Sequence, residues 1–211
     1  AAHYSWVPYT PKTKTHIILS NHNTNWDFFL IGLLVKGHMY FVASEHILRK
    51  GFTSTLIRIL ADPIPRKKGA SAKDTVAIIL DRLGRGMNVC MMAEGNRSYS
   101  GETGYISPNT GRLVKESGAG LITCRIHGGY FINPRWGKEV RKGRYSGEVV
   151  SEYTSDELAK MSEDEINSII SRDLYVNAYE DQIKDPIPYF CKNPAEHLET
   201  ALYACPECKT F

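Results

Sequence analysis

The sequence predicts an α/β fold with a mixed, mostly parallel sheet flanked by helices. Short apolar runs alternate with segments of helical periodicity along most of the chain. Polar clusters follow several of the expected strands, and open α/β sheets bind ligands at the carboxyl ends of their strands. The 211 residues are 42% hydrophobic and 23% charged, an ordinary globular composition. We therefore expect one domain over residues 1–185 and a cysteine-containing tail over residues 186–211.

The expected elements follow one another closely. Five apolar runs predict strands, and the last should pair with the one before it: residues 15–20, 39–43, 88–93, 120–126 and 146–153. Four segments have helical spacing: residues 28–35, 52–60, 71–83 and 112–117. A capping box of Ser162 and Glu165 begins a further helix, expected to reach about Tyr179. Two prolines exclude a helix over residues 62–66, which should form a stiff edge segment.

Charge, hydropathy and cysteine content restrict the class of protein. The formal net charge of +3 is too small to indicate a nucleic-acid-binding protein. No apolar run approaches the roughly 18 residues that a membrane-spanning helix needs. Cys90 and Cys124 lie in apolar runs and should be buried thiols. Because nothing resembles a disulfide framework, a reducing cytosolic compartment is favoured.

His22 and Asp27 are the most informative pair of residues. They follow the first expected strand, and their spacing would place them roughly 140° apart on a helix, so they can meet only across a turn. Asn25 is a suitable N-cap for the next helix, which puts Asp27 in the first turn, where the helix dipole favours a carboxylate. A histidine held by a carboxylate is a candidate general base for a hydroxyl group.

Two further polar clusters follow later strands. Arg66 opens a basic run directly after two prolines, which stiffen the segment and suit it to hold an anion. Glu94, Gly95 and Arg97 follow the strand at 88–93. Taken singly, a basic run is usually solvated surface and a Glu–Arg pair is often a local salt bridge. Convergence of all three clusters at one end of the sheet would make them a site.

Together these segments resemble the ordered sequence blocks of the glycerolipid acyltransferases. Residues 21–27 match the His-x4-Asp block, the segment ending at Arg66 is similar to the second block, and residues 94–97 match the Glu-Gly-x-Arg block. The apolar strand at 121–126 is similar to the fourth block but lacks its usual proline and carries Arg125, which would face the cleft and bind the acceptor. The resemblance covers roughly residues 15–130 and implies an acyltransferase domain.

The resemblance also implies a role for each matched residue. His22 would take the proton from the acceptor hydroxyl, and Asp27 would orient the imidazole. Arg66 would hold the acceptor's phosphate, with Arg97 as a second ligand. Two residues of the third block would shape the acceptor site: Glu94 and Gly95. No cofactor is implied for the chemistry.

The implied partners are an acyl donor and a lipid. The donor would be a thioester on coenzyme A or acyl carrier protein, and the acceptor a lysophosphatidic-acid-like glycerophospholipid. Because such lipids sit in a bilayer, we expect peripheral contact with the cytoplasmic face of a membrane, and no nucleic-acid partner. The sequence has no initiator Met, and we expect an N-terminal membrane segment upstream of Ala1. Tyr4, Trp6 and Tyr9 are either its interfacial remnant or caps on the core.

The tail carries an independent signal. Cys205 and Cys208 form a Cys-Pro-x-Cys motif, half of a zinc ribbon that would hold a structural zinc ion. The remaining ligands would be a pair further along the chain, or Cys191 and His197. A zinc-ribbon protein that binds nucleic acid or a partner is thus a second candidate function.

A third candidate function is a thioester or lipid hydrolase. It would combine His22 with a nucleophilic serine such as Ser20 or Ser98. The absence of a Gly-x-Ser-x-Gly nucleophile elbow counts against this function.

Overall fold

The computed structural model describes residues 3–45, 62–66, 71–202, 204 and 207–209. Within these ranges the chain forms seven strands: β1 (His3–Trp6), β2 (His16–Ser20), β3 (Met39–Ser44), β4 (Ile64–Arg66), β5 (Asn88–Met92), β6 (Gly120–His127) and β7 (Arg144–Tyr153). The helices are α1 (Asp27–Leu34), α3 (Lys73–Gly84), α4 (Asn109–Ser117), α5 (Gly129–Ile132), α6 (Ser155–Ala159), α7 (Glu163–Leu174), α8 (Ala178–Lys184) and the 3-10 helix η2 (Leu198–Thr200).

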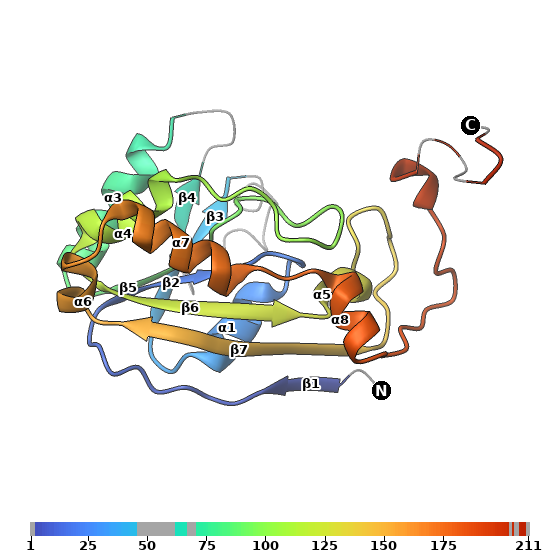
Figure 1. Cartoon of the computed structure of the whole chain (residues 1–211), viewed down its shortest axis with the longest axis horizontal. Coiled ribbons are helices and arrows are strands. Elements are labelled where there is room, and N and C mark those ends of the chain that lie inside the picture. The colour runs from blue at the N-terminus through green and yellow to red at the C-terminus, as the bar shows by residue number, and fades with distance from the viewer. Residues whose placement is uncertain (1–2, 46–61, 67–70, 203, 205–206, 210–211) are drawn as a thin grey trace.

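The strands form one sheet in the order β1-β7-β6-β2-β5-β3-β4 (Figure 1). Every neighbouring pair is parallel except β6 and β7, which are antiparallel. The predicted α/β class with a mixed, mostly parallel sheet is therefore confirmed. The segment with two prolines contains the edge strand β4, as predicted, and β7 pairs with β6, as predicted.

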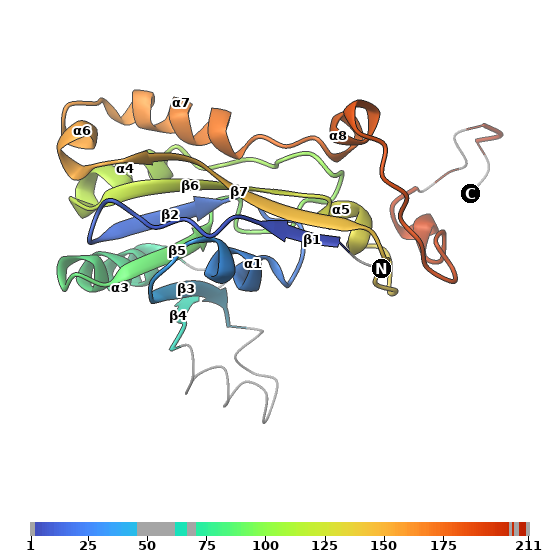
Figure 2. The same ribbon diagram turned by 90° about the horizontal axis from the view of Figure 1, so that it is seen from below.

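The core lies on both faces of the sheet, with α7 and α1 on opposite sides (Figure 2). Side chains alternate along β2, so Leu19 packs with residues of α3, α4 and α7, whereas Ile18 packs with residues of α1. Both side chains are fully buried, which is typical of a parallel strand covered on both faces. Each such side chain stabilises the fold by about 1.5–3 kcal/mol. The predicted thiols Cys90 and Cys124 are likewise buried.

The capping box of Ser162 and Glu165 is present, but the predicted end of its helix is wrong. Helix α7 ends at Leu174, and Tyr175 has an extended backbone. Asn177 then begins a separate helix, because its side chain accepts hydrogen bonds from the backbone N–H groups that follow. This helix, α8, ends at Lys184.

The two ends of the domain pack on the sheet in different ways. Trp6 of β1 packs against the core and the Tyr9 hydroxyl donates to Glu152, so both cap the domain. After α8, Phe190 pairs with Lys142 through two backbone hydrogen bonds, and the chain then runs out beyond the end of the sheet (Figure 1).

The boundary expected near residue 185 stays a prediction, and the helix expected at 52–60 lies outside the described residues. No helix in the described ranges has the length and apolar character needed to cross a membrane.

Candidate active site

The three predicted polar clusters lie at the same end of the sheet. His22 follows β2, Glu94 follows β5 and Arg66 ends β4, and these three strands are parallel to one another. Arg66 is three strands away from β2 in the sheet order, which corresponds to about 14 Å at the usual strand spacing. Glu94 follows the strand directly beside β2. The structure therefore brings the His22 and Glu94 clusters together. It places Arg66 at the same end of the sheet but three strands away from β2.

Side-chain hydrogen bonds shape the turn between β2 and α1. The Asn21 side chain accepts from Ile126 N at 2.8 Å and donates to Ile126 O at 2.9 Å, which extends the pairing of β2 with β6. Asn23 donates to the same carbonyl at 3.1 Å. Gly129 packs so closely on this turn that an added Cβ would lie 2.7 Å from Asn23 Cβ. The chain after β6 thus fixes the turn that carries His22.

His22 and Asp27 meet across this turn, as their spacing required. Nδ1 of His22 lies 2.8 Å from Oδ2 of Asp27. The Asp27 side chain is fully buried, whereas that of His22 remains 22% exposed. A neutral imidazole that donates from Nδ1 to the carboxylate keeps its lone pair on Nε2. The pair therefore has the geometry of a carboxylate-oriented general base.

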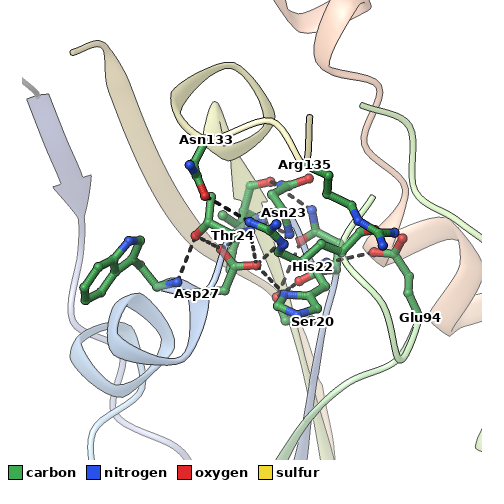
Figure 3. A network of polar contacts seen from close by, with 12 residues as sticks. Ser20, His22, Asn23, Thr24, Asp27, Glu94, Asn133 and Arg135 are labelled. Atoms are coloured by element: carbon green, nitrogen blue, oxygen red, sulfur yellow. Dashed lines mark hydrogen bonds and ion pairs between the residues drawn. The ribbon is translucent and has the colours of Figure 1, made fainter. Parts of the chain in front are cut away.

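Asp27 is held by several donors besides the imidazole (Figure 3). Oδ2 accepts from Asn23 N at 2.6 Å, and Oδ1 accepts from Thr24 N at 3.0 Å and Thr24 Oγ1 at 2.7 Å. The Tyr145 hydroxyl donates to Oδ1 at 2.5 Å from strand β7. Burial raises the pKa of Tyr145, and the charge of Asp27 raises it further. These donors satisfy the hydrogen-bonding capacity of the buried carboxylate and fix its orientation.

The first turn of α1 differs from the prediction in one respect. Asp27 is in that turn, but the expected N-cap Asn25 is wrong, because Trp26 occupies the N-cap position and has no capping side chain. Thr24 Oγ1 accepts from Trp26 N at 3.0 Å instead. The Asp27 carboxylate reaches back to the amides of the turn, and this contact replaces a separate cap.

Glu94 is bound to backbone groups. Oε1 accepts from His22 N at 2.7 Å and Oε2 accepts from Gly104 N at 2.6 Å. Burial raises the pKa of this carboxyl group, although both N–H donors oppose the shift. The neighbouring Gly95 has a φ of 68°, in the left-handed region that glycine adopts without strain. Glu94 thus ties the loop after β5 to the residue that carries the candidate base.

Arg97 lies in the same loop, close to a group of residues that the sequence blocks do not include. The next residue, Ser98, donates from its backbone N to His22 O at 2.7 Å. Arg97 Nη1 donates to Asn133 Oδ1 at 2.9 Å, and Arg135 Nη1 donates to Arg97 O at 3.2 Å. No sequence signal pointed to Asn133, Arg135 or Tyr145, because all three are more than 100 residues from His22 and reach the site through β6 and β7.

Arg125 faces helix α7. Its Nε donates to Asp173 O at 2.8 Å and its Nη2 to Arg172 O at 3.2 Å, and its Nη1 lies 3.7 Å from Glu148 Oε1. These contacts supply the partners that a charged residue in an apolar strand needs. They do not connect Arg125 with His22, so the expected contact with an acceptor stays a prediction.

The two candidate serine nucleophiles are buried and hydrogen-bonded to the backbone. Ser20 Oγ donates to Asn21 O at 3.0 Å. Ser98 Oγ donates to Glu102 O at 2.6 Å and accepts from Gly101 N at 2.9 Å. Within the described ranges, neither hydroxyl bonds the His22 ring.

The zinc half-site falls partly outside the described residues, because Cys205 is not among them. Cys208 is exposed, and Cys191 and His197 are half-buried. No group of three or more His, Cys, Asp or Glu side chains that could hold a metal ion occurs in the part of the chain that the structure describes. A structural zinc ion in the tail stays a prediction.

Comparisons with known proteins support the resemblance. A family sequence profile described as "Acyltransferase" matches residues 7–127, more than half of the chain. No curated protein sequence matches the chain. The structure is similar to the crystal structure of the 1-acyl-sn-glycerophosphate (LPA) acyltransferase PlsC from Thermotoga maritima, with a TM-score of 0.68 and 16% identity over 87% of this chain and 73% of that chain. At this identity the likeness shows a shared fold. The profile match shows more than the fold, and the chain belongs to the acyltransferase family.

Proposed function

We propose that this protein transfers a fatty acyl group from a thioester to the hydroxyl of a lysophosphatidic-acid-like glycerophospholipid. One observation carries the mechanism: the 2.8 Å contact between His22 Nδ1 and a buried Asp27 that five further hydrogen bonds from Asn23, Thr24 and Tyr145 hold in place. An imidazole held in this way has a defined tautomer and presents Nε2 as a base.

The proposed reaction is a direct transfer with no acyl-enzyme intermediate. Nε2 of His22 accepts the proton of the acceptor hydroxyl while the hydroxyl oxygen attacks the thioester carbonyl. The tetrahedral intermediate collapses, the C–S bond breaks, and the imidazolium returns its proton to the leaving sulfur. Asp27 stabilises the imidazolium throughout. A general base of this kind contributes about 10²–10⁴-fold to the rate.

The basic residues at this end of the sheet support an acceptor that carries a phosphate. Arg97 is half-buried in the loop attached to His22, and Arg66 lies at the same end of the sheet. Guanidinium groups bind phosphate through two parallel N–H donors. The similar PlsC structure is that of an LPA acyltransferase, which supports the same class of acceptor here. The donor would be acyl-coenzyme A or acyl carrier protein.

Helix α1 supports peripheral contact with a membrane. Leu30, Ile31 and Leu34 are buried against the sheet. The opposite face is also apolar: Trp26, Phe29 and Leu33 are 55%, 54% and 53% exposed. Apolar side chains spaced three or four residues apart share one helix face, and aromatic residues favour the membrane interface. Because α1 also carries Asp27, binding of this face to the cytoplasmic surface of a bilayer would bring lipid substrates close to the site.

A thiol-release assay tests the proposed reaction. The protein is incubated with acyl-coenzyme A, with and without lysophosphatidic acid, and free coenzyme A is measured. We expect release that depends on the acceptor, together with formation of phosphatidic acid. Equal release without the acceptor would indicate a hydrolase, and no release under either condition would contradict acyl transfer from coenzyme A.

A further inference from the structure

Two arginine side chains lie together beside the candidate base. Arg135 Nη1 donates to the backbone carbonyl of Arg97 at 3.2 Å, and the Arg135 guanidinium lies over the ring of Tyr99 at 5.6 Å. Arg97 Nη1 donates to the neutral side chain of Asn133 at 2.9 Å. Arg97 comes from the loop after β5, whereas Asn133 and Arg135 follow α5. Two segments that are distant in the sequence thus bring their positive charges to one place.

Neither guanidinium forms an ion pair with a carboxylate in the described part of the chain. Six other arginines do form such pairs: Arg82 with Asp62, Arg85 with Asp81, Arg112 with Glu116, Arg125 with Glu148, Arg144 with Asp185 and Arg172 with Asp173. Burial lowers the pKa of Arg97, and the charge of Arg135 lowers it further, while the Asp27 carboxylate opposes this effect. Two like charges held together, one of them half-buried, are stabilised by an anion between them.

The arginine pair belongs to the same polar network as the candidate base. Figure 3 shows Asn133 and Arg135 beside the residues that surround His22 and Asp27. Arg97 precedes Ser98, whose backbone N–H bonds the carbonyl of His22 at 2.7 Å. An anion bound by the two arginines would therefore lie near the imidazole. In a glycerophospholipid acceptor, the phosphate and the hydroxyl are joined by the short glycerol backbone, so the two groups must be bound close together.

We propose that Arg135 and Arg97 together bind the phosphate monoester of the acceptor. This inference rests on the proposed function and deepens it, because it adds a substrate-binding residue beyond residue 127, where the family match ends. Each planar guanidinium offers paired donors to phosphate oxygens, and a dianion balances both charges. Arg135 would thus help to select acceptors that carry a phosphate.

Substitution of Arg135 by Gln tests the proposal, with Arg85→Gln as the control. Arg85 is also an exposed arginine, but it pairs with Asp81 of α3. It directly follows that helix and lies near the ends of the strands that are opposite to the candidate site. We expect Arg135→Gln to raise KM for lysophosphatidic acid roughly tenfold, as for loss of one charge-assisted hydrogen bond. The KM for acyl-coenzyme A, the kcat, and the activity toward a phosphate-free monoacylglycerol should change little. The control should leave all four unchanged.

Two outcomes would overturn the assignment. An unchanged KM for lysophosphatidic acid would remove Arg135 from the acceptor site. A raised KM for acyl-coenzyme A instead would mean that the arginines bind a phosphate of the donor.

A binding measurement separates this inference from the proposed reaction. Glycerol 3-phosphate should raise the thermal midpoint of the wild-type protein, and Arg135→Gln should reduce that shift while the Arg85→Gln control retains it. Equal shifts in all three proteins would overturn the site. This result does not depend on turnover, so a protein without acyltransferase activity would contradict the proposed function but could still show the phosphate site.

Discussion

The Tyr145 hydroxyl donates a 2.5 Å hydrogen bond to Oδ1 of Asp27, while Oδ2 of the same carboxylate contacts the ring of His22. Oδ1 thus has a donor on β7, whereas Oδ2 contacts the imidazole in the turn after β2. A donor on one oxygen withdraws negative charge from the carboxylate and weakens its attraction for a protonated imidazole. Tyr145 is therefore placed to act on the candidate base through Asp27.

Tyr145→Phe should change the pH dependence of the reaction. Without the hydroxyl, Asp27 holds the protonated form of His22 more strongly, so the acid limb of the kcat/KM profile should move to higher pH. The other charged groups near the pair, Glu94 and Arg97, are unchanged. The lost bond to a buried carboxylate should also lower the free energy of unfolding by about 1–3 kcal/mol. A less stable variant with an unshifted acid limb would limit Tyr145 to a structural role.

His22→Ala should remove nearly all acyl transfer. Loss of the general base lowers kcat by about 10²–10⁴-fold. The fold should stay intact, although loss of the hydrogen bond to the buried Asp27 should lower the free energy of unfolding by about 1–3 kcal/mol. Single-turnover rates with acyl-coenzyme A and lysophosphatidic acid measure the effect. A variant that keeps most of its rate would exclude His22 as the base.

Glu94→Gln should show how this carboxyl group contributes to stability. Burial raises the pKa of Glu94 in the folded protein above its value of about 4.3 in the unfolded chain. The folded state then binds more protons between these two values, so the stability that Glu94 contributes falls as pH rises through this window. Urea unfolding from pH 4 to 7 should show that the difference in the free energy of unfolding between the wild-type protein and Glu94→Gln decreases as pH rises. A constant difference would contradict the raised pKa.

Phe29→Ser should weaken binding to lipid vesicles. The Phe29 side chain is 54% exposed on the apolar face of α1, and its transfer into a bilayer interface should contribute about 1–2 kcal/mol. Ile183→Ser is the matched control, because Ile183 is 81% exposed on α8. Co-sedimentation with vesicles that contain phosphatidic acid measures the effect. Equal binding of the two variants would exclude this face of α1 as the membrane contact.

The sequence-based predictions succeeded where the residues involved are close together in the chain. His22 and Asp27 meet through a five-residue turn, and the capping box at Ser162 is equally local. The errors arose where a nearby group competed with the expected one. Asn25 is not the N-cap because Thr24 and Asp27 satisfy the amides of the turn.

By itself, the sequence determined the class of the fold, the candidate base and the carboxylate beside it, because apolar periodicity and short turns are local properties. Only the tertiary structure decided that Tyr145 holds this carboxylate, that Arg135 joins Arg97, and that Arg125 faces α7. These contacts depend on the antiparallel pairing of β6 with β7 and on the packing of α7 against the sheet. Such long-range contacts leave no pattern of spacing in a single chain.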